Sequence, residues 1–390
     1  MVASDATSPS SATRLPSLAG LRFVCAIAVF TTHAYVSLSF NGDWTGTKAT
    51  VAMIVGRSAL SFFFVLSGFV MTWSARPGDT ARAFWRRRAA KIFPTHVVTW
   101  FAALILIVWT GGVISAAPAV SNLFLLHSWS PAFEINSSVN EVSWSLSCEA
   151  FFYLSFPLIH RFLSRIPVRH LPVWAGGTAL AVILVPLLAG TAFASEPKFA
   201  PFDVTFFQYW FVYLFPVTRL LEFVLGILLA RAVLQGSFTQ VRFRHVLVSL
   251  AVAYPLAVQV PYLYSITAVL VVPVAMAVLA GAGADIRGSS SLVRPPLMVR
   301  LGDITFAFYM VHLLVLQYLY PLFDDGSPAS PAARIVAAII LFTVSLGLAW
   351  VVHTLIEDPL ARRWGSPSRS RTGTPPAAPR SRTGGDSVVS

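Results

Sequence analysis

Charged side chains are scarce in this 390-residue chain. Asp, Glu, Lys and Arg together make up 11% of the sequence, whereas hydrophobic residues make up 56%. Soluble proteins carry about 25% charged residues, so the composition excludes a soluble enzyme with an ordinary surface. With a mean hydropathy of +0.71, the sequence instead predicts an all-α polytopic membrane protein, because helices are the usual way for apolar segments to cross a bilayer.

Cysteine and several familiar catalytic motifs are also nearly or wholly missing. Cys25 and Cys148 are the only cysteines, and both lie in apolar segments, which argues against a disulfide framework or a thiolate metal site. The sequence contains no His-Glu-x-x-His, no phosphate-binding P-loop and no Gly-x-Ser-x-Gly. We therefore predict neither a metal nor a resident cofactor.

Long apolar stretches recur along the chain. A membrane-spanning helix needs about 20 mostly apolar residues. Only Pro261 and its neighbours separate the seventh of these stretches from the eighth. The sequence predicts ten membrane-spanning helices, approximately over 18–38, 51–73, 92–113, 141–162, 171–193, 205–230, 246–260, 262–283, 302–322 and 333–356.

The basic residues give the expected orientation. The net charge of +12 is spread over short runs between apolar segments, which argues against a nucleic-acid partner. With the N-terminus inside, Lys48 and Lys198 are the only basic residues in outer loops, as the positive-inside rule requires. We predict a multi-pass protein of the plasma or inner membrane with both termini cytoplasmic. Residues 1–17 and the basic tail 361–390 are expected to be disordered on either side of a membrane domain over 18–360.

Arg22 and His33 lie within the first apolar stretch. Eleven helical residues place the two side chains on one face of a helix, about 16 Å apart along its axis. Ionisable residues inside a membrane are costly and usually functional. The pair would place a permanent cation near one membrane surface and a titratable imidazole about halfway through. The alternative is a snorkelling arginine and a histidine bonded within the core.

A cluster of basic residues precedes the third predicted span. The run that contains this cluster is expected to stop at Pro94. The cluster is suited to binding phosphates, because guanidinium groups clamp two oxygens at once, but plain positive-inside anchoring is the alternative. Its members are Arg86, Arg87, Arg88 and Lys91.

Further residues inside predicted spans are site candidates, and Glu149 is a catalytic candidate together with His33 and Arg22. Glu149 lies among aromatic residues and needs a partner or a proton there, and it is a candidate for orienting a catalytic histidine. Gly68 is expected to serve close helix packing. Arg219 with Glu222, and His353 with Glu357, are spaced for contacts within one helix. The remaining candidate site residues are Arg57, Ser67, Trp144, Tyr153 and His312.

Taken together, these motifs resemble the membrane-bound acyltransferase 3 family, which adds acyl groups to hydroxyls of carbohydrates and natural products. The resemblance covers roughly residues 15–363. It rests on Leu18-Ala-Gly-Leu-Arg22 with His33, Phe62-Phe-Phe-Val-Leu-Ser-Gly-Phe69, Arg87-Arg-Ala-Ala-Lys-Ile-Phe-Pro94, Trp144-Ser-Leu-Ser-Cys-Glu149 with Phe152-Tyr153, Tyr309-Met-Val-His312 and Glu357-Asp-Pro359.

The resemblance implies acyl-CoA as co-substrate, approaching from the cytoplasm, and an essential histidine at the position of His33. It also implies that Arg22 and the Arg87 and Arg88 positions contribute to donor binding or catalysis. Lys91 stands where arginine is commoner, and lysine lacks the bidentate fork. Ala19 and Phe23 also depart from the commoner Asp and Gly.

The expected activity is transfer of an acetyl, propionyl or similar group, either directly with His33 as general base or through an acyl-histidine. The length and the Leu-Arg-Phe opening look like members that acylate macrolide-type hydroxyls. A cell-envelope polysaccharide or peptidoglycan acceptor is the competing interpretation. A secondary transporter is the alternative of a different class, because intramembrane Arg, Glu and His also form transport paths.

Overall fold

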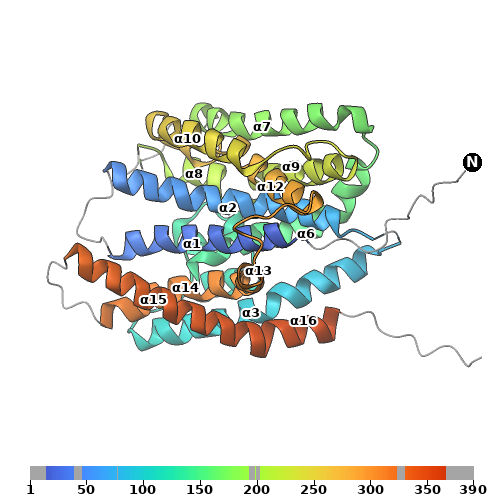
Figure 1. The fold of residues 1–390 in the computed structure, drawn as a ribbon. Helices are drawn as coiled ribbons and strands as arrows, with labels where there is room; N and C mark the ends of the chain where they lie inside the picture. Colours follow the sequence, from blue (N-terminus) through green and yellow to red (C-terminus); the bar gives the residue numbers. More distant parts are fainter. Residues whose placement is uncertain are drawn as a thin grey trace, which may run out of the picture.

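A computed structural model describes residues 15–38, 46–76, 78–192, 198, 203–322 and 330–365. These residues form a bundle of helices, and within them no strand occurs, only one isolated bridge between Lys198 and Thr205 (Figure 1). The helices are α1 (Pro16–Leu38), α2 (Thr47–Trp73), α3 (Ala81–Trp109), α4 (Ala116–Leu123), α5 (Phe133–Asn136), α6 (Trp144–Leu163), α7 (Leu171–Ala192), α8 (Phe206–Tyr209), α9 (Pro216–Leu234), α10 (Phe243–Gln259), α11 (Tyr262–Ile266), α12 (Val271–Ile286), α13 (Pro296–Asp303), α14 (Thr305–Leu319), α15 (Pro331–Val352) and α16 (Asp358–Gly365).

The fold class is confirmed: this is an all-α polytopic membrane protein. Nine helical segments of the described residues are long and apolar enough to cross a membrane. The remaining predicted span, 246–260, which is the seventh along the chain, forms α10, an apolar helix of 17 residues. At 1.5 Å per residue α10 is about 26 Å long, slightly less than the hydrocarbon thickness of about 30 Å. α10 packs on α12 and α2 at the outside of the bundle.

Three predicted boundaries were wrong. Residues 1–17 were predicted to be disordered, but the last two of them, Pro16 and Ser17, begin α1. The third span begins at Ala81, so the basic cluster forms the first turns of α3, and Pro94 lies inside this helix instead of stopping it. Neighbouring helices make such a proline tolerable in a membrane bundle. At the other end of the chain, α15 continues through a π-helical turn at His353–Glu357 into α16, which ends at Gly365. The predicted tail is therefore helical over its first five residues, 361–365, while 1–14 and 366–390 lie outside the described residues.

The centre of the bundle is the contact between α2 and α9, and two glycines make it possible. A Cβ atom on Gly68 would lie 2.0 Å from the carbonyl oxygen of Phe223, and one on Gly226 would lie 1.9 Å from that of Val65. Only a residue without a side chain fits at such backbone approaches. The packing role predicted for Gly68 is confirmed.

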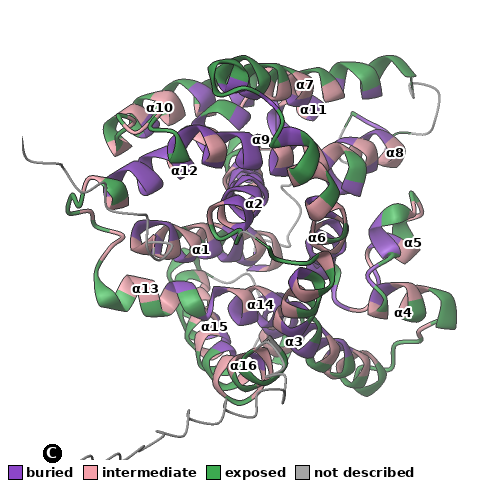
Figure 2. Ribbon diagram, turned by 90° about the vertical axis from the view of Figure 1, so that its right-hand side faces the viewer, coloured by how far each residue is buried: buried purple, intermediate pink, exposed green. Residues whose placement is uncertain are grey.

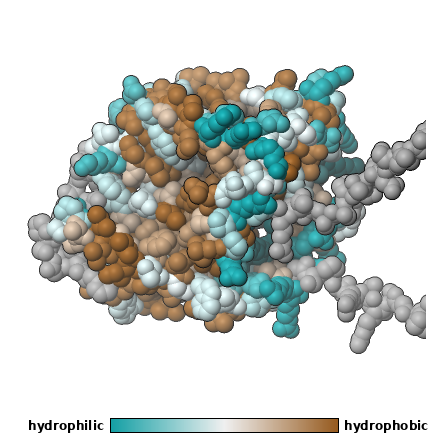
Figure 3. Space-filling view, in the orientation of Figure 1, coloured by the Kyte–Doolittle hydropathy of each residue, from teal (hydrophilic) through white to brown (hydrophobic). Residues whose placement is uncertain are grey.

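Burial falls from the centre of the bundle outwards. Figure 2 shows α2 and α9 mostly buried and surrounded by α1, α12 and α6, with exposed residues on α7, α10, α15 and α16. The exposed side chains of α15 include Ile335, Ile339 and Trp350. Apolar residues form much of the outer surface in Figure 3, and hydrophilic residues gather toward the end of the bundle where α16 finishes. An apolar outer belt of this kind matches contact with lipid.

A buried ion pair sits in the α2–α9 core. Arg219 Nη2 lies 2.9 Å from Glu222 Oε2, one helical turn away, and donates to Ser61 Oγ at 3.2 Å. Both charged side chains are almost completely buried. This confirms the contact predicted from the spacing. The opposite charges of Arg219 and Glu222 compensate each other within the core, although beyond this ion pair Arg219 Nε and both carboxylate oxygens of Glu222 have no hydrogen-bond partner among the described residues.

Candidate functional site

Helix α1 carries Arg22 and His33 to two different cavities. Arg22 lines a cavity of about 210 Å³, here called the basic cavity. His33 lines a second cavity of about 480 Å³, here called the histidine cavity. The eleven-residue spacing explains the arrangement, because it keeps both side chains on one face of α1 but about 16 Å apart. The bundle therefore holds a cation and an imidazole in separate chambers along one helix.

Only part of the basic cluster faces the basic cavity. Arg88 and Lys91 line it, together with Ile92. These residues share one face of α3, because positions three and four apart meet on a helix surface. Arg86 and Arg87 are not among the lining residues: Arg86 is exposed, and Arg87 donates to Asp79 at the helix start.

The opposite wall of the basic cavity holds an acidic and aromatic group. Tyr153 donates to Glu149 Oε2 at 2.8 Å, and Ser67 Oγ lies 3.3 Å from the same phenol oxygen. Arg88 lies with its guanidinium carbon 5.9 Å from the Tyr153 ring centroid. The structure thus brings together Arg22, Arg88, Glu149, Tyr153 and Ser67, all of which the sequence identified as candidates.

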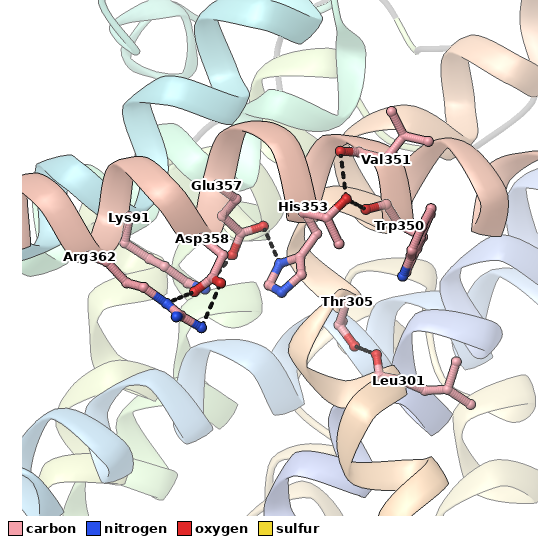
Figure 4. Close-up of polar contacts among 10 residues, drawn as sticks. Lys91, Leu301, Thr305, Trp350, Val351, His353, Glu357, Asp358 and Arg362 are labelled. Carbon is pink, nitrogen blue, oxygen red and sulfur yellow. Dashed lines mark hydrogen bonds and ion pairs between the residues drawn. The ribbon is translucent and has the colours of Figure 1, made fainter.

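Lys91 on α3 is paired with Glu357 in the neighbouring π-helical turn. Its ammonium group donates to Glu357 Oε1, and Glu357 Oε2 lies 3.3 Å from His353 Nδ1 (Figure 4). The Glu357 side chain is 0% exposed, whereas that of Lys91 is 43% exposed. His353 and Glu357 are the first and last residues of a π-helical turn. Such turns are frequent at functional sites. The contact between His353 and Glu357 predicted from their spacing is confirmed.

The partner of His33 is His312 on α14. His33 Nδ1 lies 2.8 Å from His312 Nε2, and the two rings stack with centroids 5.1 Å apart. His312 Nδ1 lies 2.7 Å from the carbonyl oxygen of Tyr309. Glu149, in contrast, lines the basic cavity and bonds Tyr153, so its predicted role of orienting a catalytic histidine has no support in a contact with His33.

These hydrogen bonds assign the protons on the two neutral imidazoles. A carbonyl oxygen only accepts, so the proton of His312 is on Nδ1, and its Nε2 presents a lone pair. That lone pair accepts a hydrogen bond from Nδ1–H of His33. The proton-free nitrogen of His33 is therefore Nε2, which is the form a general base requires.

Arg57 lies in the histidine cavity among three tyrosines. It donates to the Tyr262 hydroxyl, and its guanidinium carbon lies 4.7, 5.8 and 6.0 Å from the ring centroids of Tyr262, Tyr213 and Tyr209. All four residues line the cavity, as does Trp144. Cation–π contacts of this kind stabilise a buried guanidinium. The cavity thus has a cationic, aromatic wall.

Irregular backbone lines the histidine cavity. The predicted span 205–230 is interrupted: a π-helical turn at Trp210–Leu214 leads to Phe215 in extended conformation, and Pro216 then starts α9. Tyr262 belongs to the short α11, which a turn at 267–270 separates from α12. Non-helical backbone at membrane depth is tolerated where it is buried or lines a cavity.

The segment between α3 and α6, most of which no predicted span covers, folds against the bundle. Asn140 Nδ2 donates to the carbonyl oxygen of Met310 at 3.0 Å, and Asn122 Nδ2 donates to that of Ser138 at 2.7 Å. Burial lowers the pKa of His127 in this segment to about 3, so this histidine stays neutral. Buried amide groups hydrogen-bonded to backbone fix the segment against α14.

Sequence reasoning missed several residues of the histidine cavity. Glu141, Tyr209, Tyr213 and Tyr262 all line it. The i, i+4 spacing of Tyr209 and Tyr213 was the available signal, since it puts two aromatic rings on one helical face. Tyr309, quoted only as part of a motif, lines both cavities.

Comparisons with known proteins show which family the chain belongs to. A family model described as an acyltransferase domain matches residues 15–354. Acyltransferase MdmB of Streptomyces mycarofaciens is 38% identical over 388 residues, which cover 95% of this chain and 97% of that protein. Nodulation protein 10 of Rhizobium leguminosarum bv. viciae is 24% identical over 321 residues, covering 77% of this chain and 82% of that protein. No solved structure matches. The chain therefore belongs to the membrane-bound acyltransferase 3 family, and it is a multi-pass membrane acyltransferase.

Proposed function

We propose that this protein transfers an acyl group from acyl-CoA to a hydroxyl of a macrolide-type natural product or its sugar, in the plasma or inner membrane, with His33 as general base. One observation carries the proposal. His33 lines a cavity large enough for a small-molecule acceptor, and its neighbouring cavity is lined by cations suited to a phosphorylated donor.

The donor is assigned to the basic cavity on charge and size. Coenzyme A carries several phosphate charges, and arginines bind phosphate through charge-assisted hydrogen bonds. The cavity of about 210 Å³ is smaller than the 300–1,000 Å³ usual for drug-sized ligands. Only the acyl thioester end fits inside, and Arg22 and Arg88 in the lining are the proposed contacts for the phosphates. Lys91 takes a lesser part, because Glu357 already holds its ammonium group.

Transfer needs one proton acceptor. His33 Nε2 takes the proton of the acceptor hydroxyl as its oxygen attacks the thioester carbonyl carbon. The tetrahedral intermediate then collapses, the carbon–sulfur bond breaks, and the thiolate of coenzyme A leaves. The proton on His33 returns to that thiolate, so the products are the ester and free coenzyme A. His312 stabilises the imidazolium by accepting from its Nδ1–H.

The acceptor is assigned to the histidine cavity. Its volume of about 480 Å³ lies within the range for small-molecule pockets, and its aromatic wall suits an amphipathic molecule that carries hydroxyls. The similarity to Acyltransferase MdmB over nearly the whole chain supports the acyl-transfer activity itself. An extended cell-envelope glycan is the competing acceptor, and the assay below compares the two classes.

Turnover by the purified protein tests the proposal. Release of free thiol from acetyl- and propionyl-CoA is measured in detergent with macrolides, sugars and peptidoglycan fragments as acceptors. We expect His33→Ala to lose about 10² to 10⁴ in rate. His170→Ala is the matched control, since His170 is exposed in the turn before α7. Acceptor-dependent release at the wild-type rate in His33→Ala contradicts the proposed role of His33. Absence of thiol release with every acceptor favours the transporter instead.

A further inference from the structure

Two residues line both cavities: Leu60 on α2 and Tyr309 on α14. Among the described residues, no other belongs to both linings. The two cavities are therefore neighbours, with this pair between them. In the proposed reaction a thioester from the basic cavity must reach a hydroxyl in the histidine cavity, so the reacting carbon passes between the two chambers beside Leu60 and Tyr309.

Tyr309 is the fixed member of the pair. Its hydroxyl donates to the carbonyl oxygen of Val142 at 2.9 Å and lies 2.7 Å from Ser145 Oγ. Its own carbonyl oxygen accepts from His312 at 2.7 Å. The ring of Tyr309 cannot turn away without breaking the two contacts of its hydroxyl. Those contacts, to Val142 and Ser145, set the position of the ring.

Leu60 has no polar group to fix it and is held by packing alone. Its side chain is 5% exposed. The basic cavity beside it has an apolar wall that includes Phe63, Leu66, Leu146 and Phe306. An aliphatic chain attached to the thioester would pack against these apolar residues. The volume of the side chain at position 60 then decides how much room is left for that chain.

We propose that Leu60, working against the fixed ring of Tyr309, is the residue that determines which acyl chain lengths the enzyme transfers. The proposal rests on the proposed function, because it assumes an acyl thioester in the basic cavity. No motif in the sequence identifies Leu60 as a specificity residue.

The experiment measures kcat/KM for acetyl-, propionyl-, butyryl- and hexanoyl-CoA with the acceptor of highest turnover. It compares the wild type with Leu60→Val, Leu60→Ala and Leu60→Phe. The dissociation constants of the same acyl-CoAs, measured by calorimetry without acceptor, provide a readout that does not depend on turnover. Leu228→Ala is the matched control, because Leu228 is a buried leucine on α9 that lines neither cavity.

We expect the ratio of kcat/KM for butyryl-CoA to that for acetyl-CoA to rise from Leu60 to Val to Ala and to fall in Leu60→Phe. One methylene in an apolar pocket changes kcat/KM by about 10- to 200-fold, so the shift is on the order of tenfold or more. Leu228→Ala should keep the wild-type ratio. Equal ratios in the wild type, Leu60→Val and Leu60→Ala overturn this inference while leaving the proposed function intact. Failure of the wild type to bind or turn over any acyl-CoA overturns both.

Discussion

The hydrogen bond between His33 and His312 yields the sharpest prediction. Replacing His312 by phenylalanine keeps an aromatic ring beside Phe30 and Phe308, whose centroids lie 6.3 and 5.8 Å from that of His312. It removes the nitrogen that accepts from Nδ1–H of His33. Nothing then holds the proton of His33 on Nδ1, and the base loses both its orientation and the support for its charged form.

The size of the effect follows from that lost acceptor. A buried donor left without a partner costs about 1–3 kcal/mol, and each 1.36 kcal/mol in the barrier is tenfold in rate. We therefore expect kcat to fall about 5- to 150-fold in His312→Phe. The KM for acyl-CoA should stay near the wild-type value, since His312 is not among the residues that line the basic cavity.

The assay is the thiol-release measurement at saturating acceptor, with thermal unfolding in detergent as a check on folding. His312→Gln is the conservative variant, because its amide oxygen can accept from His33, and it should retain more activity than His312→Phe. A matched control is His96→Phe, since His96 is equally buried on α3 but bonds only backbone carbonyls of Asn122 and Leu123. Wild-type kcat in a folded His312→Phe variant would refute the reasoning.

Three further predictions follow from the contacts. Lys91→Met should lower the free energy of unfolding by about 1–3 kcal/mol, since the buried carboxylate of Glu357 loses a charged hydrogen-bond partner that is itself 43% exposed. Glu357→Gln should cost less, because the Lys91 side chain is 43% exposed and stays hydrated. Gly226→Ala should destabilise the bundle by about 1–3 kcal/mol or more through overpacking, whereas Gly176→Ala, in open space, should not. Arg88→Gln should raise the KM for acyl-CoA by about 10- to 150-fold, through loss of 1.5–3 kcal/mol of charged hydrogen bonding, with kcat nearly unchanged.

Each of these has a clear contrary result. If thermal unfolding shows Glu357→Gln to be less stable than Lys91→Met, burial of the Glu357 carboxylate does not decide the cost of breaking the pair. Equal melting temperatures for Gly226→Ala and Gly176→Ala would contradict the close approach of α2 and α9. If the KM for acyl-CoA is unchanged in Arg88→Gln but raised in Arg87→Gln, the donor binds at the outer face of α3 and not in the basic cavity.

Local features of the sequence predicted much of the protein. Apolar stretches of membrane-spanning length identified the all-α fold, because length and hydropathy are properties of each segment alone. Contacts within one helix were equally accessible: Arg219 with Glu222 follows from a spacing of three residues. The shared face of Arg22 and His33 follows from eleven residues of regular helix.

Other features were decided only by how the helices pack. His33 and His312 are 279 positions apart, and Lys91 and Glu357 are 266 apart. No helical period relates such pairs, so their contact depends on which faces of α1, α14, α3 and the π-helical turn meet. The break at Phe215 and the folded segment around Asn140 also escaped prediction. Their polar backbone is stable at that depth because neighbouring helices and cavities satisfy it. The sequence by itself determined the spans and the family. The tertiary structure alone decided which nitrogen of His33 is free and which residues lie between the two cavities, because both depend on contacts between residues distant in sequence.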